Sequence, residues 1–401
     1  MLSRHLWGDV WSQEVGEVSW ASAPIRVAHV MGKMCGGGVE SMVMNYYRHI
    51  DKSVVQFDFL VDGDSALVPS SEINALGGRV FVVSPYQQLF CYMKDLSDLV
   101  RSQRWQIVHS HVNSLSVFPL YVANRIGVPV RIAHSHSASG GDEHVKNAAK
   151  AILKTQANRY PTHRLACSRY AGEWLFGENA DFDVLYNAIE LEHFAFDAET
   201  RAKVRMELGL TDAVFAVGHI GRFVSQKNQG FLIDAFAQLL NRRPDSVLVL
   251  VGDGEQRALM EHRAEERGIG GKVMFLGQRS DVGRIYQALD VFALPSLYEG
   301  LGIVLVEAQM AGLPCLASGT TPREVNIAGA VEFLPIDDPA VWAEALARLA
   351  CCRISTARTK NSSIFSAYDI NEAASWLSEY YVSALVASGS CVGSSGREVV
   401  K

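Results

Sequence analysis

The stretch 297-LYEGLGIVLVEAQMAGLP-314 places one carboxylate beside a glycine-rich turn and a second one inside an apolar helix. Glu299 stands immediately before the turn Gly300-Leu301-Gly302, and Glu307 follows two helical turns later. A helix that buries an apolar face needs neither carboxylate, and a buried carboxylate without a partner is costly. The pattern therefore indicates either a ligand or a structural partner for each glutamate.

Short β-rich runs alternate with helix-length segments on both sides of this stretch. Strands are expected at about 25–31, 56–61, 79–84, 106–111, 128–136, 162–168, 183–189, 214–220, 246–252, 272–277, 290–296, 313–318 and 330–335. Helices are expected from about 39, near 70, from about 88 and from about 115, and again at 231–240, 255–267, 285–289, 301–312 and 340–350. Such alternation is typical of parallel sheets covered by helices, so the sequence predicts an α/β protein with Rossmann-like sheets.

Chain length and one break in this pattern predict two domains. The 401 residues exceed what one hydrophobic core usually serves. The acid-rich run ELEHFAFDAETR at 190–201 interrupts the alternation as a less patterned connector. The expected order is an N-terminal extension at 1–24, a first Rossmann-like domain at 25–190, a second at 191–370, a helix at 371–386 that crosses back to the first domain, and a disordered Gly/Ser-rich tail at 387–401.

Composition excludes several classes of protein. The net charge of −6 disfavours a nucleic-acid binder that neutralises phosphates over a broad surface. The 7 cysteines form no metal-ligand spacing, which indicates free thiols in a reducing cytoplasm. The chain shows neither the apolar core of a signal peptide nor a run of about 18 apolar residues for a membrane span. We therefore expect a soluble intracellular protein.

Polar residues follow the predicted strands at the point where each strand ends. In open parallel sheets, ligands bind beyond these carboxyl ends. The residues found there are Gly36-Gly37-Gly38, His109, His111, His134, His136 and Asn187 in the first half, and Arg222, Lys227, Gly252-Asp253-Gly254 and Glu299 in the second. Two such sheet edges that face each other predict an interdomain cleft.

The features of the first half each have a structural alternative. Residues 36–38 form either a tight turn or a loop that lets the backbone approach a phosphate or sugar closely. In each His-x-His pair, strand alternation puts both rings on one face, where they are either packed structural groups or site residues. No carboxylate lies at a supporting spacing, so we expect no metal site.

The features of the second half point more directly to an anion. Arg222 and Lys227 lie between a strand and a helix, where a guanidinium and an ammonium suit a diphosphate, although surface cations are ordinarily only solvated. Glu299 serves as either a helix cap or a ligand contact. Glu307 can accept from two neighbouring ribose hydroxyls, and its alternative is a buried ion pair.

At this point the sequence resembles a known family. The segments GGGVE, HSHVNS, RIAHSHS, YNAIELEHF, GRFVSQKN, VGDGE and EGLGIVLVEAQMAGLP, in this order, resemble the retaining nucleotide-sugar glycosyltransferases of family 4, also called group 1. The similarity covers about residues 25–385 and is greatest to the branch that builds exopolysaccharide and capsule. It implies the GT-B architecture, in which two Rossmann-like parallel-sheet domains face each other across a cleft.

The resemblance also implies roles for individual residues. Arg222 and Lys227 match the family's ligands of the donor diphosphate, Glu299 matches a carboxylate against the donor sugar, and Glu307 matches the ribose ligand. His134 or His136 matches a histidine important for transfer, with His134 preferred. The remaining expected donor contacts are Gly37, Gly38, Gly252, Glu255, Gly300, Leu301, Gly302 and Ile303. Acceptor-side or secondary positions are expected at His109, His111, His136 and Asn187.

The implied reaction is transfer of a hexosyl residue from a nucleotide sugar, expected to be a UDP-sugar, to a glycan or polyprenyl-linked acceptor with retention of configuration. Arg222 and Lys227 would neutralise the departing diphosphate, so neither a metal ion nor another cofactor is expected. One alternative is a nucleotide-sugar epimerase on the same fold. Another is a catalytically silent subunit of a glycan-assembly complex, which the intact Arg/Lys and Glu/Glu sets disfavour.

Residues 142–170 carry an excess of positive charge. The cations are Lys146, Lys150, Lys154, Arg159, Arg164 and Arg169. A helix over HVKNAAKAILKTQANRY would place its apolar residues opposite the lysines, either to dock on an anionic membrane or as a solvated face. The protein is therefore expected in the cytoplasm, with this segment as a contact to the inner face of the plasma membrane.

Overall fold

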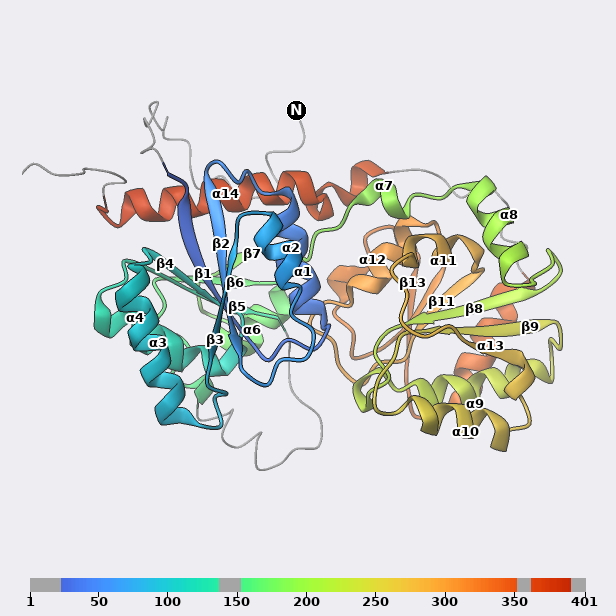
Figure 1. Cartoon of the computed structure of the whole chain (residues 1–401). Helices are drawn as coiled ribbons and strands as arrows, with labels where there is room; N and C mark the ends of the chain where they lie inside the picture. Colours follow the sequence, from blue (N-terminus) through green and yellow to red (C-terminus); the bar gives the residue numbers. More distant parts are fainter. Residues whose placement is uncertain (1–22, 137–152, 352–361, 391–401) are drawn as a thin grey trace, which may run out of the picture. The chain divides into compact units, whose positions relative to one another are not determined.

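The computed structural model describes residues 23–136, 153–351 and 362–390. These residues form two compact units (Figure 1). The first unit holds residues 23–136, 153–189 and 366–390, and the second holds residues 190–351 and 362–365. The predictions that residues 1–24 form an extension and 387–401 a tail lie almost entirely outside the described residues.

The first unit is built on a parallel sheet of 7 strands in the order β3-β2-β1-β4-β5-β6-β7. The strands are β1 (Ile25–Gly32), β2 (Val55–Asp62), β3 (Arg79–Val83), β4 (Ile107–Ser110), β5 (Val130–Ser135), β6 (His163–Ala166) and β7 (Asp183–Val184). The helices are α1 (Gly38–His49), α2 (Ser70–Ala75), α3 (Leu89–Gln103), α4 (Val117–Ile126), α6 (Arg169–Phe176) and α14 (Ile370–Ala387). Strand order reverses between β1 and β4, which is where doubly wound sheets open a ligand-binding crevice.

Strand alternation divides the first unit into two apolar layers. Val27, Phe57 and Ile132 belong to a core shared with α1 and α14. Ala28 and Val108, which point the opposite way, belong to a core shared with α3, α4 and α6. Helix α14 also packs against α1, and it is thus part of the first unit although it closes the described chain (Figure 1).

The second unit repeats the plan with a parallel sheet of 6 strands in the order β10-β9-β8-β11-β12-β13. The strands are β8 (Phe215–Ile220), β9 (Ser246–Val251), β10 (Val273–Phe275), β11 (Val291–Leu294), β12 (Cys315–Ser318) and β13 (Val331–Leu334). The helices are α7 (Leu191–Phe194), α8 (Ala198–Glu207), α9 (Gln229–Leu240), α10 (Arg257–Glu266), α11 (Val282–Ala288), α12 (Ile303–Met310) and α13 (Pro339–Cys351). Here the order reverses between β8 and β11, so the second expected ligand site lies at their carboxyl ends.

The predicted elements are close to those observed, with two corrections. The run 190–201, expected to be an unpatterned connector, contains α7 and the start of α8. The expected strand at 183–189 is only two residues long. Leu185 still donates to Ala166 of β6, but from Tyr186 onward the chain bonds elsewhere, since Tyr186 accepts a hydrogen bond from Tyr46 and Ile189 donates to Tyr368. The prediction of α/β architecture with two Rossmann-like sheets is confirmed.

Candidate functional site

Lys227 and Glu299 form an ion pair at the point where the second sheet reverses its order. The ammonium of Lys227 lies 2.6 Å from Oε1 of Glu299, and their side chains are 18% and 7% exposed. Lys227 ends a short 3-10 helix after β8, and Glu299 follows β11. The helix-cap alternative for Glu299 is not what the structure shows, since its carboxylate bonds to Lys227 and no bond to an α12 amide is present in the described chain.

Hydrogen bonds between the two loops hold this ion pair in place. Gln226 donates through Nε2 to the carbonyl of Tyr298, and its own carbonyl accepts from the amide of Leu297. Asn228 donates through Nδ2 to the carbonyl of Pro295. Since these bonds join segments about 70 residues apart in sequence, Lys227 and Glu299 are positioned by the sheet and not by local structure.

Arg222 is exposed and lies in the same loop, five residues before Lys227. No hydrogen bond or ion pair of its guanidinium occurs among the described residues, while its backbone carbonyl accepts from Nε2 of Gln229. A cation on an anchored backbone with an uncommitted head group is suited to an external anion.

Two glycines after β9 support the backbone of the Arg222 loop. Gly252 has a φ of 130°, and a Cβ built there would lie 2.1 Å from the carbonyl oxygen of Gly221. Gly254 has a φ of 156°, and its Cβ would lie 2.5 Å from the carbonyl oxygen of Phe223. These glycines therefore have a structural reason that the sequence did not indicate. Glu255, the predicted contact beside a nucleoside base, is exposed.

The start of α12 offers backbone donors beside the ion pair. Gly302 precedes the helix with a φ of 87°, a conformation that favours glycine. The amides of Leu301, Gly302 and Ile303 find no acceptor within the described part of the chain. Free amides and the helix dipole favour negative charge at such a helix start. The expectation that residues 300–303 could meet an anion is therefore compatible with their geometry.

Glu307 is partly buried in the second turn of α12 and accepts a hydrogen bond from the hydroxyl of Tyr286, at 2.8 Å from Oε2. The ion-pair alternative is wrong, since no cation pairs with Glu307 among the described residues. Burial raises the pKa of Glu307 to about 7, and the bond from Tyr286 opposes this rise. Tyr286, on α11, was not anticipated, because nothing in the spacing links it to Glu307.

In the first unit, the glycine loop is occupied by a side chain of its own helix. The carboxylate of Glu40 accepts from the amides of Cys35, at 2.8 Å, of Gly36, and of Gly37, at 2.9 Å. This arrangement is half of a capping box at the start of α1. Of the two expected donor contacts, Gly37 thus has an internal partner, and Gly38 opens the helix. Their proposed role toward a ligand stays a prediction.

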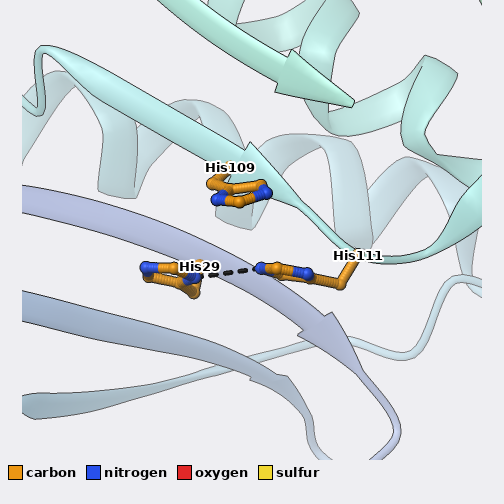
Figure 2. Close-up of side chains that lie close together, drawn as sticks. All are labelled: His29, His109 and His111. Atoms are coloured by element: carbon orange, nitrogen blue, oxygen red, sulfur yellow. Dashed lines mark hydrogen bonds between the residues drawn. The ribbon is translucent and has the colours of Figure 1, made fainter. Parts of the chain in front are cut away.

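The four predicted histidines lie together with a fifth that was not anticipated, His29 of β1. All five are buried on the α1/α14 face of the first sheet. As expected, each His-x-His pair shares a face, with ring centroids 4.2 Å apart for His109 and His111 and 3.9 Å apart for His134 and His136. Figure 2 shows His29 beside His111, with Nδ1 of the former 2.9 Å from Nε2 of the latter.

Burial keeps these imidazoles neutral. It lowers the pKa of His29, His109, His111 and His134 well below the usual value, and that of His136 to about 3. Each of the sets His29–His109–His111 and His111–His134–His136 has ring nitrogens within 4.8 Å of one another, which is close enough to consider a metal ion. The neutral imidazole is the form that ligates metals, so protonation does not exclude a metal ion here. The orientation of the rings decides between a metal site and hydrogen bonds from ring to ring.

Two further polar groups at strand ends have no partner in the described chain. Oδ1 of Asn187, a predicted secondary residue, is buried without a hydrogen bond. His219, which was not anticipated, is the next-to-last residue of β8, just before the loop that carries Lys227. Its Nδ1 lies 2.9 Å from the carbonyl of Ala293, so it donates there, and Nε2 is a buried acceptor without a partner. Both are groups that a ligand could satisfy.

The cationic segment 142–170 is described only in part. Residues 137–152, which include most of the proposed membrane helix, lie outside the described residues. Of the remaining cations, Lys154 lies over the ring of Trp174 at 4.9 Å, and Arg169 lies 3.5 Å from Glu173. Within the described ranges, no helix is long and apolar enough to cross a bilayer.

Comparison with solved structures agrees with this architecture. HepE of Anabaena, solved in complex with UDP and glucose, superposes with a TM-score of 0.74 at 20% identity, covering 90% of this chain and 100% of its own. At this identity the similarity concerns the fold. Together with the two sheets of identical plan, it defines the chain as a protein of the GT-B glycosyltransferase fold.

Sequence comparison then identifies the family. Residues 37–187 match the model described as glycosyl transferase 4-like domain, and residues 201–363 match glycosyl transferases group 1. EpsF of Bacillus subtilis, which is named as a glycosyltransferase, is 36% identical over 82% of this chain and 88% of its own. An Escherichia coli α-1,3-galactosyltransferase that acts from UDP-Gal on GlcNAc-diphosphoundecaprenol is 25% identical over 90% and 98%. The chain belongs to the group 1 glycosyltransferases and is an enzyme of that class.

Proposed function

We propose that this enzyme transfers a hexosyl residue from a UDP-sugar to a polyprenyl-linked or glycan acceptor, with retention of anomeric configuration, during assembly of a bacterial surface polysaccharide. The observation that carries the proposal is the Lys227–Glu299 ion pair. The loop of Lys227 also carries Arg222, and the loop of Glu299 leads into the amides of residues 301–303. Neither the guanidinium of Arg222 nor these amides have a partner among the described residues. The cations and helix amides at this sheet edge complement the negative charge of a diphosphate, and the carboxylate can accept a hydrogen bond from a sugar hydroxyl.

The same groups account for catalysis. Cleavage of the bond between the anomeric carbon and the phosphate builds negative charge on the leaving diphosphate. Arg222, Lys227 and the amides at 301–303 would stabilise this charge more strongly in the transition state than in the ground state. In our proposal this neutralisation makes a divalent metal unnecessary. Lys227 would then exchange Glu299 for the diphosphate, which would free the carboxylate to accept from a sugar hydroxyl.

The proposed acceptor class rests on a relative. The E. coli relative acts on a diphosphoundecaprenol-linked sugar, as its name states, and it aligns with nearly this whole chain. A lipid-linked acceptor would place the enzyme at the inner face of the plasma membrane. The cationic segment 142–170 would supply the attraction to anionic lipid.

A transfer assay with full-length protein tests the proposal. UDP-sugars and GDP-sugars are each incubated with diphosphoundecaprenol-linked GlcNAc, with and without EDTA, and the anomeric configuration of the product is read by NMR. The proposal expects an α-linked product from an α-linked UDP-sugar in the presence of EDTA. An inverted product, loss of turnover in EDTA, or an epimerised free donor in place of a transfer product would each contradict it.

A further inference from the structure

The five buried histidines form two separate hydrogen-bonded chains. In the first, the hydroxyl of Tyr381 lies 2.7 Å from Nδ1 of His109, whose Nε2 lies 3.1 Å from Nδ1 of His134. In the second, Nδ1 of His29 contacts Nε2 of His111, whose Nδ1 lies 2.9 Å from Nε2 of His136. We call these the tyrosine-ended chain and the histidine-only chain.

The ring orientations fit shared protons better than a metal ion. The rings of His29 and His111 are within 9° of parallel and meet edge to edge, so their facing nitrogens point at each other (Figure 2). His109 instead lies over His111, with ring centroids 4.2 Å apart and ring planes tilted by 30°, so its nitrogens do not point into that pair. A metal ion needs three lone pairs aimed at one point about 2.0–2.1 Å from each nitrogen. In the other candidate set, the facing nitrogens of His111 and His136 likewise lie at hydrogen-bond distance, 2.9 Å apart. Both chains are therefore held by hydrogen bonds, each of which has a donor end and an acceptor end.

Tyr381 decides the direction of the first chain. Its hydroxyl is completely buried on α14, and Nδ1 of His109 is its one hydrogen-bond partner within the described residues. If His109 donated to this hydroxyl, the phenolic hydrogen would be left buried without an acceptor. In that case Nε2 of His134 would also be a buried acceptor without a partner in the described chain. With Tyr381 donating and Nδ1 of His109 accepting, only the Nε2–H of His134 is left without a partner there. Because this direction leaves fewer buried polar groups unsatisfied, it is the favoured one.

The direction of the hydrogen bond from Tyr381 fixes the direction of the next hydrogen bond in the tyrosine-ended chain. A neutral His109 that accepts at Nδ1 carries its proton on Nε2 and donates it to Nδ1 of His134. His134 is then protonated at Nε2, a buried nitrogen that has no partner in the described chain. The histidine-only chain has no such end group, since Nε2 of His29 and Nδ1 of His136 both lack partners there. Its direction is therefore not set by its surroundings.

We propose that Tyr381, acting through His109, holds His134 in the Nε2–H tautomer, so that His134 presents a hydrogen-bond donor and not a base. Tyr381 and His109 are thus positioning residues for the transfer reaction, and this inference rests on the proposed function. A neutral imidazole N–H can donate to a sugar or acceptor oxygen but cannot remove a proton. The lowered pKa values keep the whole chain neutral, as this arrangement requires.

The tautomer can be measured without substrate. In full-length protein labelled with ¹⁵N-histidine, NMR distinguishes a protonated from an unprotonated ring nitrogen, and substitution of each histidine assigns the signals. We expect His134 to be protonated at Nε2 in the wild type and to become a mixture of tautomers in Tyr381→Phe. Tyr380→Phe is the matched control, because it removes a neighbouring hydroxyl that bonds to neither histidine chain. A wild-type His134 protonated at Nδ1, or a tautomer unaffected by Tyr381→Phe, would overturn the proposal.

Replacement of His109 distinguishes the effect of its hydrogen bonds from the effect of its packing. In His109→Gln, the amide can accept from Tyr381 through its oxygen and donate to His134 through its NH₂ group, so the Nε2–H tautomer should persist. In His109→Leu, a residue of similar size offers neither group, and the tautomer preference should disappear. If His109→Leu kept the preference, the chain would not transmit it.

Turnover provides an independent reading. Tyr381→Phe and His109→Leu should lower kcat for transfer by about 10- to 100-fold, as loss of a supporting hydrogen bond to a functional histidine commonly does, while His109→Gln retains more activity. KM for the nucleotide sugar should change little. If the wild type transfers no sugar, the proposed function fails while the tautomer result stands. Stoichiometric metal in the purified protein that EDTA removes together with the His134 signal would overturn the hydrogen-bonded chain itself.

Discussion

The ammonium of Lys227 and the carboxylate of Glu299 contact each other at 2.6 Å, although 72 residues separate them and both side chains are largely withdrawn from solvent. An ion pair this buried is sensitive to removal of one partner, because the other charge is left without compensation. The same pair lies where the doubly wound sheet opens a ligand site. Stability and activity are therefore coupled at this point of the molecule.

Removal of Lys227 should reduce stability as well as turnover. Lys227→Ala leaves Glu299 buried and unpaired, and we expect the free energy of unfolding to fall by on the order of 3 kcal/mol. The double variant Lys227→Met/Glu299→Gln should recover most of this loss and none of the activity. Urea unfolding and donor turnover measure the two effects. Lys203→Ala, which breaks the exposed pair with Glu199, is the control and should leave both unchanged.

Arg222 should separate activity from stability. Its guanidinium has no partner in the described chain, so Arg222→Ala should leave the unfolding midpoint unchanged while it lowers kcat for donor cleavage by about 10²- to 10³-fold. Arg242→Ala, another exposed arginine of the same unit, serves as the control. Equal activity of the two variants would show that Arg222 does not contact the leaving group.

Glu307 should make stability depend on pH in the opposite sense from most carboxylates. Its pKa of about 7 in the folded protein lies above the ordinary value of 4.5, so its contribution is fully present below about pH 4.5 and is lost as the pH rises through 7. Glu307→Gln, which cannot ionise, should therefore raise the melting temperature relative to wild type more at pH 8 than at pH 5.

Ligand binding should respond to Glu307 in the reverse manner. If the carboxylate accepts from the ribose hydroxyls, protection of the wild type by UDP should weaken as the pH falls below 7. In Glu307→Gln the protection should be weaker at every pH and independent of pH in this range. Glu344→Gln, an exposed position on α13, is the control for both measurements. Undiminished protection of Glu307→Gln by UDP would contradict the ribose role.

The five buried histidines should make the first unit sensitive to mild acid. Burial lowers their pKa values below 6.5, so the unfolded chain takes up protons that the folded chain does not. Stability is thus complete above about pH 6.5 and is lost as the pH falls below it. Each histidine contributes a slope of about 1.4 kcal/mol per pH unit in that range.

Melting temperatures between pH 7.5 and 5.5 measure this slope. His29→Phe removes one titrating group, so it should reduce the slope of stability against pH by the contribution of one histidine, whatever the effect of the substitution on stability at neutral pH. His262→Gln, an exposed histidine of α10, is the control. A pH profile that is flat over this range would mean that the folded and unfolded chains take up the same number of protons, and therefore that burial does not lower these pKa values.

Sequence reasoning located most strands and helices because their apolar residues repeat with the period of the element. It failed at α8, where the periodic signal is weak: the buried residues of this helix are Val204 and Arg205, and the guanidinium of Arg205 bonds to the carbonyls of Thr211, Val214 and Ala288. A buried arginine that satisfies backbone carbonyls does not resemble an apolar stripe. The four residues of α7 are likewise too few to show a period.

The candidate site was predicted as a set of residue types at strand ends, but not as a set of contacts. Lys227 and Glu299 were each selected, yet only strand order brings them together. His29 was missed because a single histidine inside a strand has no distinguishing pattern. It joins the cluster because β1 lies next to β4 and pairs His29 with His109. Tyr381 was missed because it lies far from His109 in the sequence, and only the folded chain brings the two together.

Gly252 shows how a motif can serve the site through the backbone alone. A Cβ at this position would meet the carbonyl of Gly221 at 2.1 Å, and the φ of 130° is unfavourable for other residues. Gly252→Ala must therefore push the loop that carries Arg222 away from β9. We expect lower stability, by about 1–3 kcal/mol for strain of this kind, and weaker protection by UDP in thermal unfolding.

The matched control is Gly271→Ala, a surface position with no atom within 4 Å of the added Cβ and no positive φ. This substitution should leave the melting temperature and the protection by UDP as they are in the wild type, or raise stability slightly by restricting the unfolded chain. If Gly252→Ala kept full stability but lost protection, the glycine would be needed for direct approach of the ligand. If it lost stability and protection together, the close contact with Gly221 would be the reason that glycine is required after β9.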